Sequence, residues 1–289
     1  MKMKFLIMVV VIAALFSNCK KDEQVTSNIP AAYTSAVASK GGMLYDKFWA
    51  PETGYDQGSA KLATLNAKPD FFRCKQCHGW DLKGRTGSYI NRTPKTSRPN
   101  IAALDLSSYV KAKTEQELFD GMKKTIGRRS LSTDLTTYNP ATPSTLTEGD
   151  KMPNYSELLS DAQIWDIVKY LKEGALDVTQ LYDATYTGVY PTGSVAFSNI
   201  GKNGNAANGN AHYKAKCLMC HGADGKLIPN LDATTGMTVG KFIRSKPNEL
   251  QHKIKFGQLG TVMLGDFAIT LSQMKDLYKA GTDLTNFPD

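Results

Sequence analysis

The sequence Cys74-Lys75-Gln76-Cys77-His78-Gly79 decides how the rest of the chain is organised. It occurs a second time as Cys217-Leu218-Met219-Cys220-His221-Gly222. Two cysteines three positions apart, with a histidine directly after the second, form the attachment signature of c-type haem. The thiols add across two vinyl groups of the porphyrin, and the imidazole becomes the proximal iron ligand. On one helical turn, the two sulfurs can reach neighbouring vinyl groups while the histidine lies beneath the iron.

Two other kinds of site also use Cys-x-x-Cys pairs. The two pairs together could form a four-cysteine zinc site, or either pair could be a thioredoxin-like redox centre. However, a zinc site does not require a histidine after each pair, and the pairs lie far apart in the sequence. The sequence therefore predicts two covalently bound haem c groups. The predicted attachment residues and proximal iron ligands are Cys74, Cys77, His78, Cys217, Cys220 and His221.

The N-terminus has the pattern of an export signal. Lys2 and Lys4 precede an apolar run over residues 5–16, which is too short for a membrane-spanning helix. Leu15-Phe16-Ser17-Asn18-Cys19 then resembles a bacterial lipobox, in which the cysteine becomes the acylated first residue of the mature protein. We expect a signal peptide over residues 1–18 and a lipid anchor on Cys19, with a signal peptide cut elsewhere as the alternative. The protein is then exported and anchored to a bacterial membrane, facing the periplasm or the cell surface.

The cysteine count and the charge limit the partners. Five cysteines divide into one candidate lipid anchor and four haem thioethers, so no thiol remains for a disulfide or a distal haem ligand. The formal net charge of +8 is spread over both halves without a Lys/Arg cluster. We therefore expect a solvated basic surface that favours acidic redox proteins as partners, and no nucleic-acid partner.

The sequence after the first motif recurs in degenerate form after the second. Pro99-Asn100-Ile101 corresponds to Pro229-Asn230-Leu231, and an amphipathic C-terminal helix is predicted in each copy. Ser160 caps the first of these helices and Thr270 caps the second. A methionine precedes each cap at a similar distance: Met152 lies eight residues before Ser160, and Met263 lies seven before Thr270.

A further helix is predicted over residues 114–127, where Thr114 and Glu117 can form a capping box. Its apolar residues share one face, so Met122 is most simply a core residue. That face consists of Leu118, Phe119, Met122 and Ile126.

Composition and repeats together give the expected domain boundaries. A small and polar segment over residues 19–39 suits a tether behind the lipid anchor. The first domain is expected over residues 40–174, and the second over 208–289. Residues 175–207 are rich in Gly, Asn, Thr and Tyr without a helical period, which is typical of a connection between domains.

In this order, the motif, the Pro-Asn pair, the methionine and the capped C-terminal helix resemble bacterial class I cytochrome c domains in tandem. The resemblance implies a mainly α fold, in which two small helical domains with long loops each wrap around a covalent haem. It implies that the proline carbonyl accepts the Nδ1–H of the proximal histidine. It also implies that Met152 and Met263 are the distal iron ligands.

The chain departs from the family pattern at two places, and some assignments stay open. Residues 50–73 separate the first helix from its motif, and Leu264 replaces the proline expected after Met263. The alternative distal ligands of the first haem are Met122 or a histidine from elsewhere, and those of the second are Met237 and His252. Arg128 and Arg129 either pair with haem propionates or belong to a solvated loop.

The expected function is single-electron transfer between respiratory or periplasmic redox partners. An iron held by histidine and methionine is six-coordinate, so it carries electrons and has no open position for a substrate. A tethered subunit that serves one fixed enzyme is a variant of this reading. The alternative is a dihaem oxidoreductase with one open haem, peroxidase-like or active on a small inorganic substrate. Such an enzyme needs acid–base groups, and the chain has only four histidines.

Overall fold

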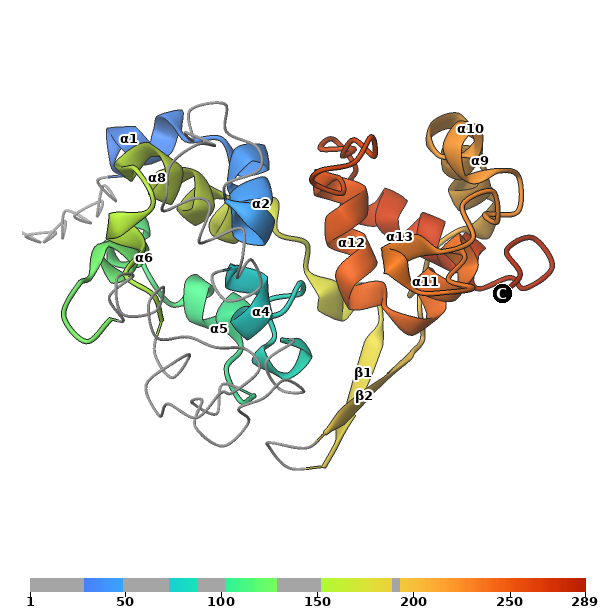
Figure 1. Ribbon diagram of the computed structural model, residues 1–289, viewed down its shortest axis with the longest axis horizontal. Coiled ribbons are helices and arrows are strands. Elements are labelled where there is room, and N and C mark those ends of the chain that lie inside the picture. Colours follow the sequence, from blue (N-terminus) through green and yellow to red (C-terminus); the bar gives the residue numbers. More distant parts are fainter. Residues whose placement is uncertain (1–28, 49–72, 88–101, 129–151, 189–192) are drawn as a thin grey trace, which may run out of the picture.

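The computed structural model describes residues 29–48, 73–87, 102–128, 152–188 and 193–289, which are mainly helical. They form two lobes, the first lobe from residues 29–174 and the second lobe from residues 175–289 (Figure 1). Within these ranges, no helix is both long enough and apolar enough to cross a membrane. The predicted signal peptide over residues 1–18 and the candidate anchor Cys19 lie outside the described residues.

The first lobe is built from short helices. Its elements are α1 (Ala31–Ser35), α2 (Ala38–Lys47), α4 (Cys74–His78), the 3₁₀ turn η2 (Gly84–Thr86), α5 (Leu106–Lys111), α6 (Glu115–Lys123), the 3₁₀ turn η4 (Tyr155–Glu157), α8 (Asp161–Lys169) and the π-helical turn η5 (Tyr170–Gly174).

The second lobe begins with a hairpin and continues with helices. Its elements are the 3₁₀ turn η6 (Val178–Gln180), β1 (Asp183–Thr187), β2 (Ser194–Ser198), α9 (Ala206–Lys216), α10 (Leu218–His221), the 3₁₀ turn η7 (Leu231–Ala233), α11 (Val239–Ser245), α12 (Pro247–Phe256) and α13 (Leu271–Gly281).

In each lobe an N-terminal helix crosses a C-terminal helix at a glycine. A Cβ atom on Gly41 of α2 would lie 1.8 Å from the carbonyl oxygen of Asp166 in α8. A Cβ atom on Gly209 of α9 would lie 2.0 Å from the carbonyl oxygen of Asp276 in α13. Only glycine allows the two backbones to approach this closely. The two helix pairs are therefore the same structural unit, repeated in each lobe.

The same aspartates hold the start of the crossing helices. A carboxylate oxygen of Asp166 accepts the backbone N–H of Val37 at 2.6 Å, and one of Asp276 accepts the backbone N–H of Asn205 at 2.7 Å. Val37 and Asn205 are the N-cap residues of α2 and α9, whose first N–H groups have no partner within the helix. Each contact fixes one helix end against the middle of another helix.

Each lobe has an apolar core, and the first core includes a residue of the second lobe, Phe256. The first apolar cluster contains Tyr33, Leu44, Tyr45, Phe48, Cys74, Leu82, Val110, Leu118, Met122, Tyr155, Leu159, Ile164, Trp165, Ile167, Val168, Tyr170 and Phe256. The second apolar cluster contains Val178, Leu181, Tyr182, Tyr213, Met237, Phe242, Ile243, Leu250, Ile269, Met274, Leu277, Tyr278, Ala280 and Phe287.

The predicted helix starts are present, but the helix predicted over residues 114–127 ends earlier than expected. Capping boxes form at Thr114, Ser160 and Thr270, with the residue three positions later as the second partner of each. Met122 is buried in the first apolar cluster, as expected. Ile126 is 84% exposed, because α6 ends at Lys123 and the chain then leaves the helical conformation.

Part of the predicted tether is packed against the first lobe. Tyr33 of α1 is buried in the first apolar cluster, and its hydroxyl donates a 2.6 Å hydrogen bond to Glu173. Over residues 29–39 the structure therefore differs from the polar tether expected for 19–39. The buried Tyr33 ring and the hydrogen bond from the Val37 N–H to Asp166 both hold this small and polar segment on the first lobe.

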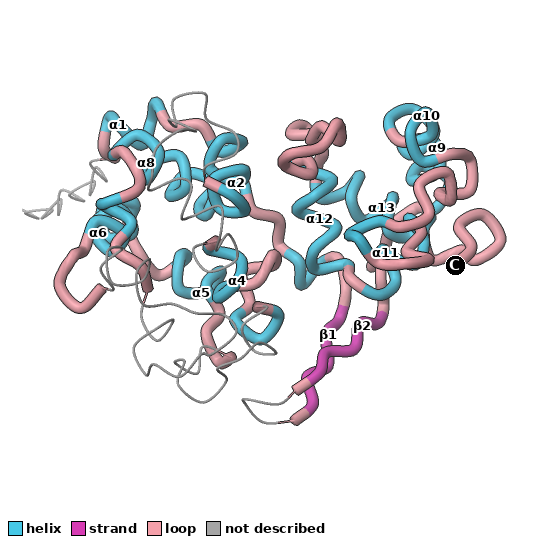
Figure 2. Tube along the Cα trace, in the orientation of Figure 1, coloured by secondary structure: helices cyan, strands magenta, loops and turns pink. Residues whose placement is uncertain are grey.

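The segment expected to connect the domains, residues 175–207, contains a hairpin. β1 and β2 pair antiparallel, with Asp183 opposite Ser198 and Thr187 opposite Ser194 (Figure 2). The residues before the hairpin, including Leu181 and Tyr182, belong to the second apolar cluster. The connection is therefore part of the second lobe.

Candidate haem attachment sites

Each attachment motif forms one short helical turn that ends at a glycine. α4 contains Cys74 and His78, and α10 ends at His221. The glycines that follow have nearly identical backbone angles, with φ of 76° at Gly79 and 78° at Gly222. These positive φ values favour glycine, and they turn the chain away directly after each histidine. The two motifs therefore repeat in backbone conformation as well as in sequence.

A tyrosine from the crossing helix holds each of these turns. Tyr45 of α2 donates a hydrogen bond of 2.6 Å to the carbonyl of Gly79, and Tyr213 of α9 donates one of 2.8 Å to the carbonyl of Gly222. The sequence analysis missed this pair. Both tyrosines lie four residues after the helix-crossing glycine, and this repeated Gly-x-x-x-Tyr spacing could have revealed them.

Among the described residues the four motif cysteines form no disulfide, and the two pairs lie in different lobes. Burial raises the pKa of Cys74 to about 12 and that of Cys217 to about 11, so both are protonated near neutral pH. Because α4 and α10 are well separated (Figure 1), one zinc ion cannot bind both pairs. The structure therefore favours the haem interpretation over a four-cysteine zinc site.

Both histidines are half-buried, with Nδ1 covered, and are in the neutral form that binds iron. Burial, together with the nearby Arg128 guanidinium, lowers the pKa of His78 to about 4, and burial also lowers the pKa of His221. The imidazoles are therefore neutral near pH 7, as metal ligation requires. Among the described residues, Nδ1 of each histidine is buried without a hydrogen-bond partner. The expected acceptor for His221, the carbonyl of Pro229, does not receive this bond, and Pro99 lies outside the described residues.

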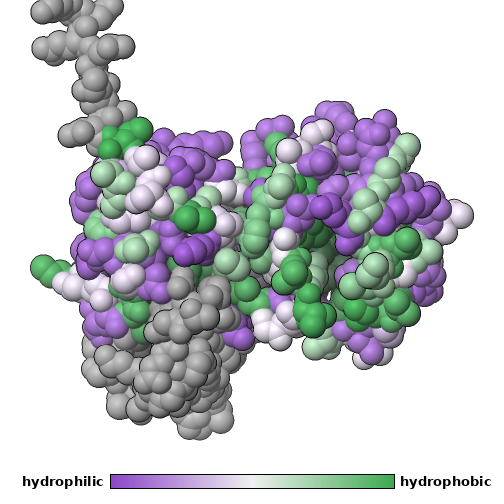
Figure 3. Space-filling view, turned by 90° about the horizontal axis from the view of Figure 1, so that it is seen from above, coloured by the Kyte–Doolittle hydropathy of each residue, from purple (hydrophilic) through white to green (hydrophobic). Residues whose placement is uncertain are grey.

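The surroundings of the motifs fit a porphyrin. Apolar side chains are exposed on the second lobe, where Figure 3 shows hydrophobic residues gathered on the surface. In the first lobe, Nε of Arg128 is buried without a partner among the described residues, and such an atom can bind an anionic propionate. The exposed apolar residues of the second lobe's motif and loops are Leu218, Met219, Leu227, Ile228, Val262 and Leu264.

The cytochrome c family model matches residues 66–175 and 206–279, which together make up more than half of the chain. The chain belongs to the cytochrome c family. Each matched range contains one attachment motif, so the protein has two cytochrome c domains. Such domains bind haem c covalently, and the protein is a haem-based electron-transfer protein. A search of curated proteins finds no match to the chain.

The two methionines occupy different surroundings in their cytochrome c domains. Met152 is half-buried and packs against the first apolar cluster, as Cys77 does. Met263 lies in the loop between α12 and α13, where its N–H donates to the Thr261 hydroxyl at 3.2 Å and its carbonyl accepts the N–H of Gln258 at 3.1 Å. The backbone of the Met263 loop is thus held by local hydrogen bonds.

The alternative distal ligands are placed elsewhere. Met122 and Met237 are buried in the first and second apolar clusters. His252 of α12 faces the first lobe, where its ring lies 4.9 Å from the Trp80 ring and 6.1 Å from the Tyr45 ring. None of these three side chains is free to turn toward a haem without leaving its packing.

The two attachment turns differ in how they are covered. α12 packs on α2 and on the residues after α4, and Gln251 donates a 2.8 Å hydrogen bond to the carbonyl of Trp80. Lys75 and Gln76, the middle residues of the first motif, are buried. Met219, a middle residue of the second motif, is 91% exposed. The second lobe therefore shields the first attachment turn, while its own turn faces outward.

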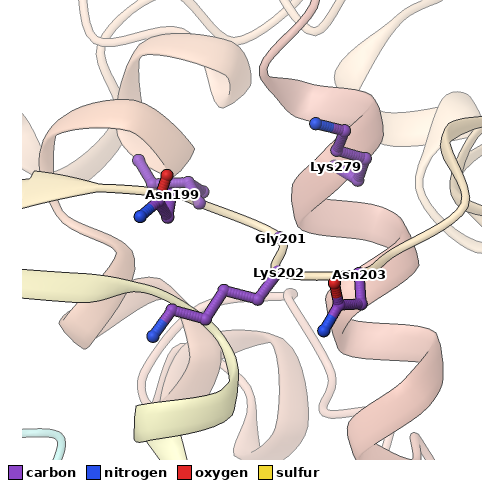
Figure 4. A pocket seen from close by; sticks show the side chains of 6 residues that line it. Asn199, Gly201, Lys202, Asn203 and Lys279 are labelled. Carbon is purple, nitrogen blue, oxygen red and sulfur yellow. The ribbon is translucent and has the colours of Figure 1, made fainter.

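A pocket of about 350 Å³ lies away from both motifs, where the loop after β2 meets α13 (Figure 4). Two lysines line it, but Lys202 already binds the carbonyl of Thr179 at 2.9 Å and the carboxylate of Asp183. None of the residues that line the pocket is an attachment residue. Its lining residues are Asn199, Ile200, Gly201, Lys202, Asn203 and Lys279.

Proposed function

We propose that the protein binds two haem c groups, one on each attachment turn, and passes single electrons between redox proteins. The observation that supports two groups is the repeated local structure: a motif turn, a positive-φ glycine and a tyrosine bond to that glycine in both cytochrome c domains. Haem c supplies a one-electron change at iron. The chain supplies the thiols of Cys74, Cys77, Cys217 and Cys220, together with the neutral imidazoles of His78 and His221.

We further propose Met152 and Met263 as the distal ligands that close both sites. Met152 packs on the same apolar cluster as Cys77, and the rivals Met237 and His252 are held in other contacts. A thioether and an imidazole together favour the reduced state more than two imidazoles do. Two closed sites suit an electron carrier.

The alternative function is a dihaem oxidoreductase in which one iron is open to a small substrate. The second site is the better candidate for such an opening. Leu264 stands where the family has a proline, and the residues on both sides of Met263, Val262 and Leu264, are almost fully exposed. A methionine in such a loop is less firmly held than Met152.

The partners and location follow from the exposed surface and the N-terminus. We propose that external redox proteins exchange electrons at the second lobe, because its attachment turn is exposed whereas the first is buried. The chain remains basic without Lys2 and Lys4 of the expected signal peptide, with a formal net charge of 33 − 27 = +6, and this favours an acidic partner surface. We also propose that the protein is exported and held at a bacterial membrane by a lipid on Cys19.

Haem content tests the proposed function directly. Mature protein should carry two haems per chain that survive acid–acetone extraction, and Cys217→Ala combined with Cys220→Ala should reduce the covalently bound haem to one. Stoichiometric zinc, or a single haem in the wild type, would rule the proposal out. Carbon monoxide should not bind the reduced wild-type protein, and binding at one haem would favour the oxidoreductase.

A further inference from the structure

Asp81 is a buried carboxylate at the boundary between the lobes. It lies three residues after His78 and is only 3% exposed. One carboxylate oxygen accepts a 2.9 Å hydrogen bond from the hydroxyl of Tyr182, which belongs to the second apolar cluster. The other accepts the N–H of Lys83 at 3.2 Å and the hydroxyl of Thr86. The second lobe therefore covers this carboxylate.

The cations nearest to Asp81 in the sequence are engaged with other groups. The ammonium of Lys83 lies 2.5 Å from the Asp105 carboxylate, and the guanidinium of Arg85 lies over the Tyr186 ring at 5.1 Å. The cations next to Trp80 are also engaged: Nζ of Lys75 lies 4.5 Å from the centroid of that ring, and Nζ of Lys253 lies 2.8 Å from the carboxylate of Glu249. Among the described residues, Asp81 thus has no ion-pair partner.

Among the described residues, five tyrosine phenols lie close enough to Asp81 to be affected by its charge. The negative charge of Asp81 raises the pKa of each phenol, in addition to the effect of burial, so all of them are uncharged near neutral pH. Burial in turn raises the pKa of Asp81 to about 6, despite the three hydrogen bonds to its carboxylate. The phenols belong to Tyr45 of α2, Tyr170 of η5, Tyr182, Tyr186 of β1 and Tyr278 of α13.

The second cytochrome c domain contains a matched position without this burial. Asp224 lies three residues after His221, and it accepts the N–H of Lys226 at 3.1 Å, as Asp81 accepts that of Lys83. Asp224 is exposed to solvent. The two aspartates therefore have the same place in the repeat and the same local turn, and they differ in their surroundings.

We propose that Asp81 is a proton-binding site coupled to the oxidation state of the first cytochrome c domain. When a redox protein donates one electron to this domain, Asp81 would take one proton from solvent; a haem on His78 would supply the one-electron change. Oxidation by an acceptor protein removes the electron and releases the proton. This inference rests on the proposed function, because it requires haem iron on His78.

The coupling follows from the sign of the charges. An added electron makes the site more negative, and a nearby buried carboxylate then binds a proton more tightly, because the surrounding protein screens poorly. The reduction potential of the first domain should accordingly fall as the pH rises through about 6. The exposed Asp224 is screened by water, so its oxidation-linked proton binding should be much weaker.

Proton uptake on reduction gives a direct test. Holoprotein with two haems per chain is reduced in weakly buffered solution between pH 5 and 8, and the protons bound per chain are followed with an indicator dye. We expect uptake by the wild type near pH 6, loss of most of this uptake in Asp81→Asn, and unchanged uptake in Asp224→Asn. Equal uptake by wild type and Asp81→Asn would overturn the inference and assign the protons to another group, such as a haem propionate.

A second variant keeps the test decisive if Asp81→Asn fails to fold. Tyr182→Phe removes one hydrogen bond to the charged carboxylate, so the pKa of Asp81 should rise and the maximum of proton uptake should shift to higher pH. An unshifted maximum would contradict the role of Asp81. Haem content is measured on the same samples, so a missing first haem would disprove the proposed function, whereas two haems without Asp81-dependent uptake would disprove this inference alone.

Discussion

The hydroxyl of Tyr45 lies 2.6 Å from the carbonyl oxygen of Gly79, the residue that directly follows the first attachment motif. Tyr213 and Gly222 repeat this relationship at 2.8 Å in the second lobe. The chain between tyrosine and motif is long in the first lobe and very short in the second. The contact is nevertheless the same, which indicates that the tyrosine positions the histidine turn in each domain.

Removing either tyrosine hydroxyl should destabilise its domain. Tyr45→Phe leaves the buried carbonyl of Gly79 without this donor, and we expect a loss of about 1–2 kcal/mol in the free energy of unfolding. Tyr213→Phe should cost less, because its hydrogen bond is only partly buried. Urea denaturation of the holoprotein, followed at the haem absorption, measures both losses. A larger effect of Tyr213→Phe would contradict the ranking by burial.

The helix-crossing glycines should not tolerate a methyl group. Gly41→Ala and Gly209→Ala would each place a Cβ atom within 2.0 Å of a backbone carbonyl oxygen, so the helices must move apart. We expect each variant to lose about 3 kcal/mol of stability or to fail to fold. Gly121→Ala is the control, because a Cβ atom there would meet nothing within 4 Å. That helical substitution should stabilise the protein by up to about 1 kcal/mol, and thermal unfolding distinguishes the two outcomes.

His252 should make the contact between the lobes sensitive to acid. Burial lowers its pKa from 6.5 to about 4, so its contribution to stability is fully present above pH 6.5 and is lost as the pH falls toward 4. The loss corresponds to roughly 3 kcal/mol. His252→Phe should lack this part of the pH dependence. The raised pKa of Asp81 makes the folded protein more stable as the pH falls over this range. Because Asp81 is present in both wild type and His252→Phe, its effect cancels when the unfolding free energies of the two proteins are subtracted.

The comparison for His252 is therefore made as a difference between two unfolding curves. Urea denaturation of wild type and His252→Phe at several pH values between 4 and 7.5 gives that difference directly. As the pH falls, the free energy of unfolding of wild type should decrease relative to that of His252→Phe. A constant difference over the whole range would show that His252 is not held neutral between the lobes.

The membrane attachment can be separated from haem binding by one substitution. Cys19→Ser should release the protein from the membrane fraction while both haems remain, because the anchor and the haem sites use different cysteines. Membrane fractionation followed by haem staining measures both properties in one sample. Wild-type protein that fractionates as soluble periplasmic material would contradict the lipobox assignment.

The sequence correctly predicted the features that depend on residues close together in the chain, such as helix caps. The Thr114, Ser160 and Thr270 caps each depend on a partner three residues away, and the structure confirms all three. The family match likewise confirms the mainly α fold and the two cytochrome c domains. The caps and the attachment motifs can be recognised because each consists of residues only a few positions apart.

Contacts between distant segments could not be predicted in this way. The bond between Tyr182 and Asp81 joins residues of different lobes, and the burial of His252 depends on Trp80 and Tyr45. The hairpin of β1 and β2 was missed because both strands are half-exposed and have a weak apolar alternation. At Ile126 the sequence predicted too much regular structure. The apolar pattern of a helix continues to this residue, but α6 ends at Lys123.

The choice between carrier and enzyme depends on Met152 and Met263. Ferric iron bonded to a thioether has a weak far-red absorption band, which should be present in the wild type. Met152→Ala should remove roughly half of this band and Met263→Ala the other half, because each removes one of two comparable chromophores. Met122→Ala and Met237→Ala are matched controls, since these buried methionines should leave the band intact while costing about 2–5 kcal/mol of stability.

The same variants should also change ligand binding and potential. Each of Met152→Ala and Met263→Ala should lower the reduction potential of one haem and open one iron to cyanide or carbon monoxide, while the other domain keeps its spectrum. The potential falls because the thioether favours ferrous iron, and the iron opens because alanine offers no ligand atom. An unchanged band in Met263→Ala would mean that another residue, or none, closes the second site. In that case the second haem would be open to substrate, and the oxidoreductase would replace the carrier as the better account of this protein.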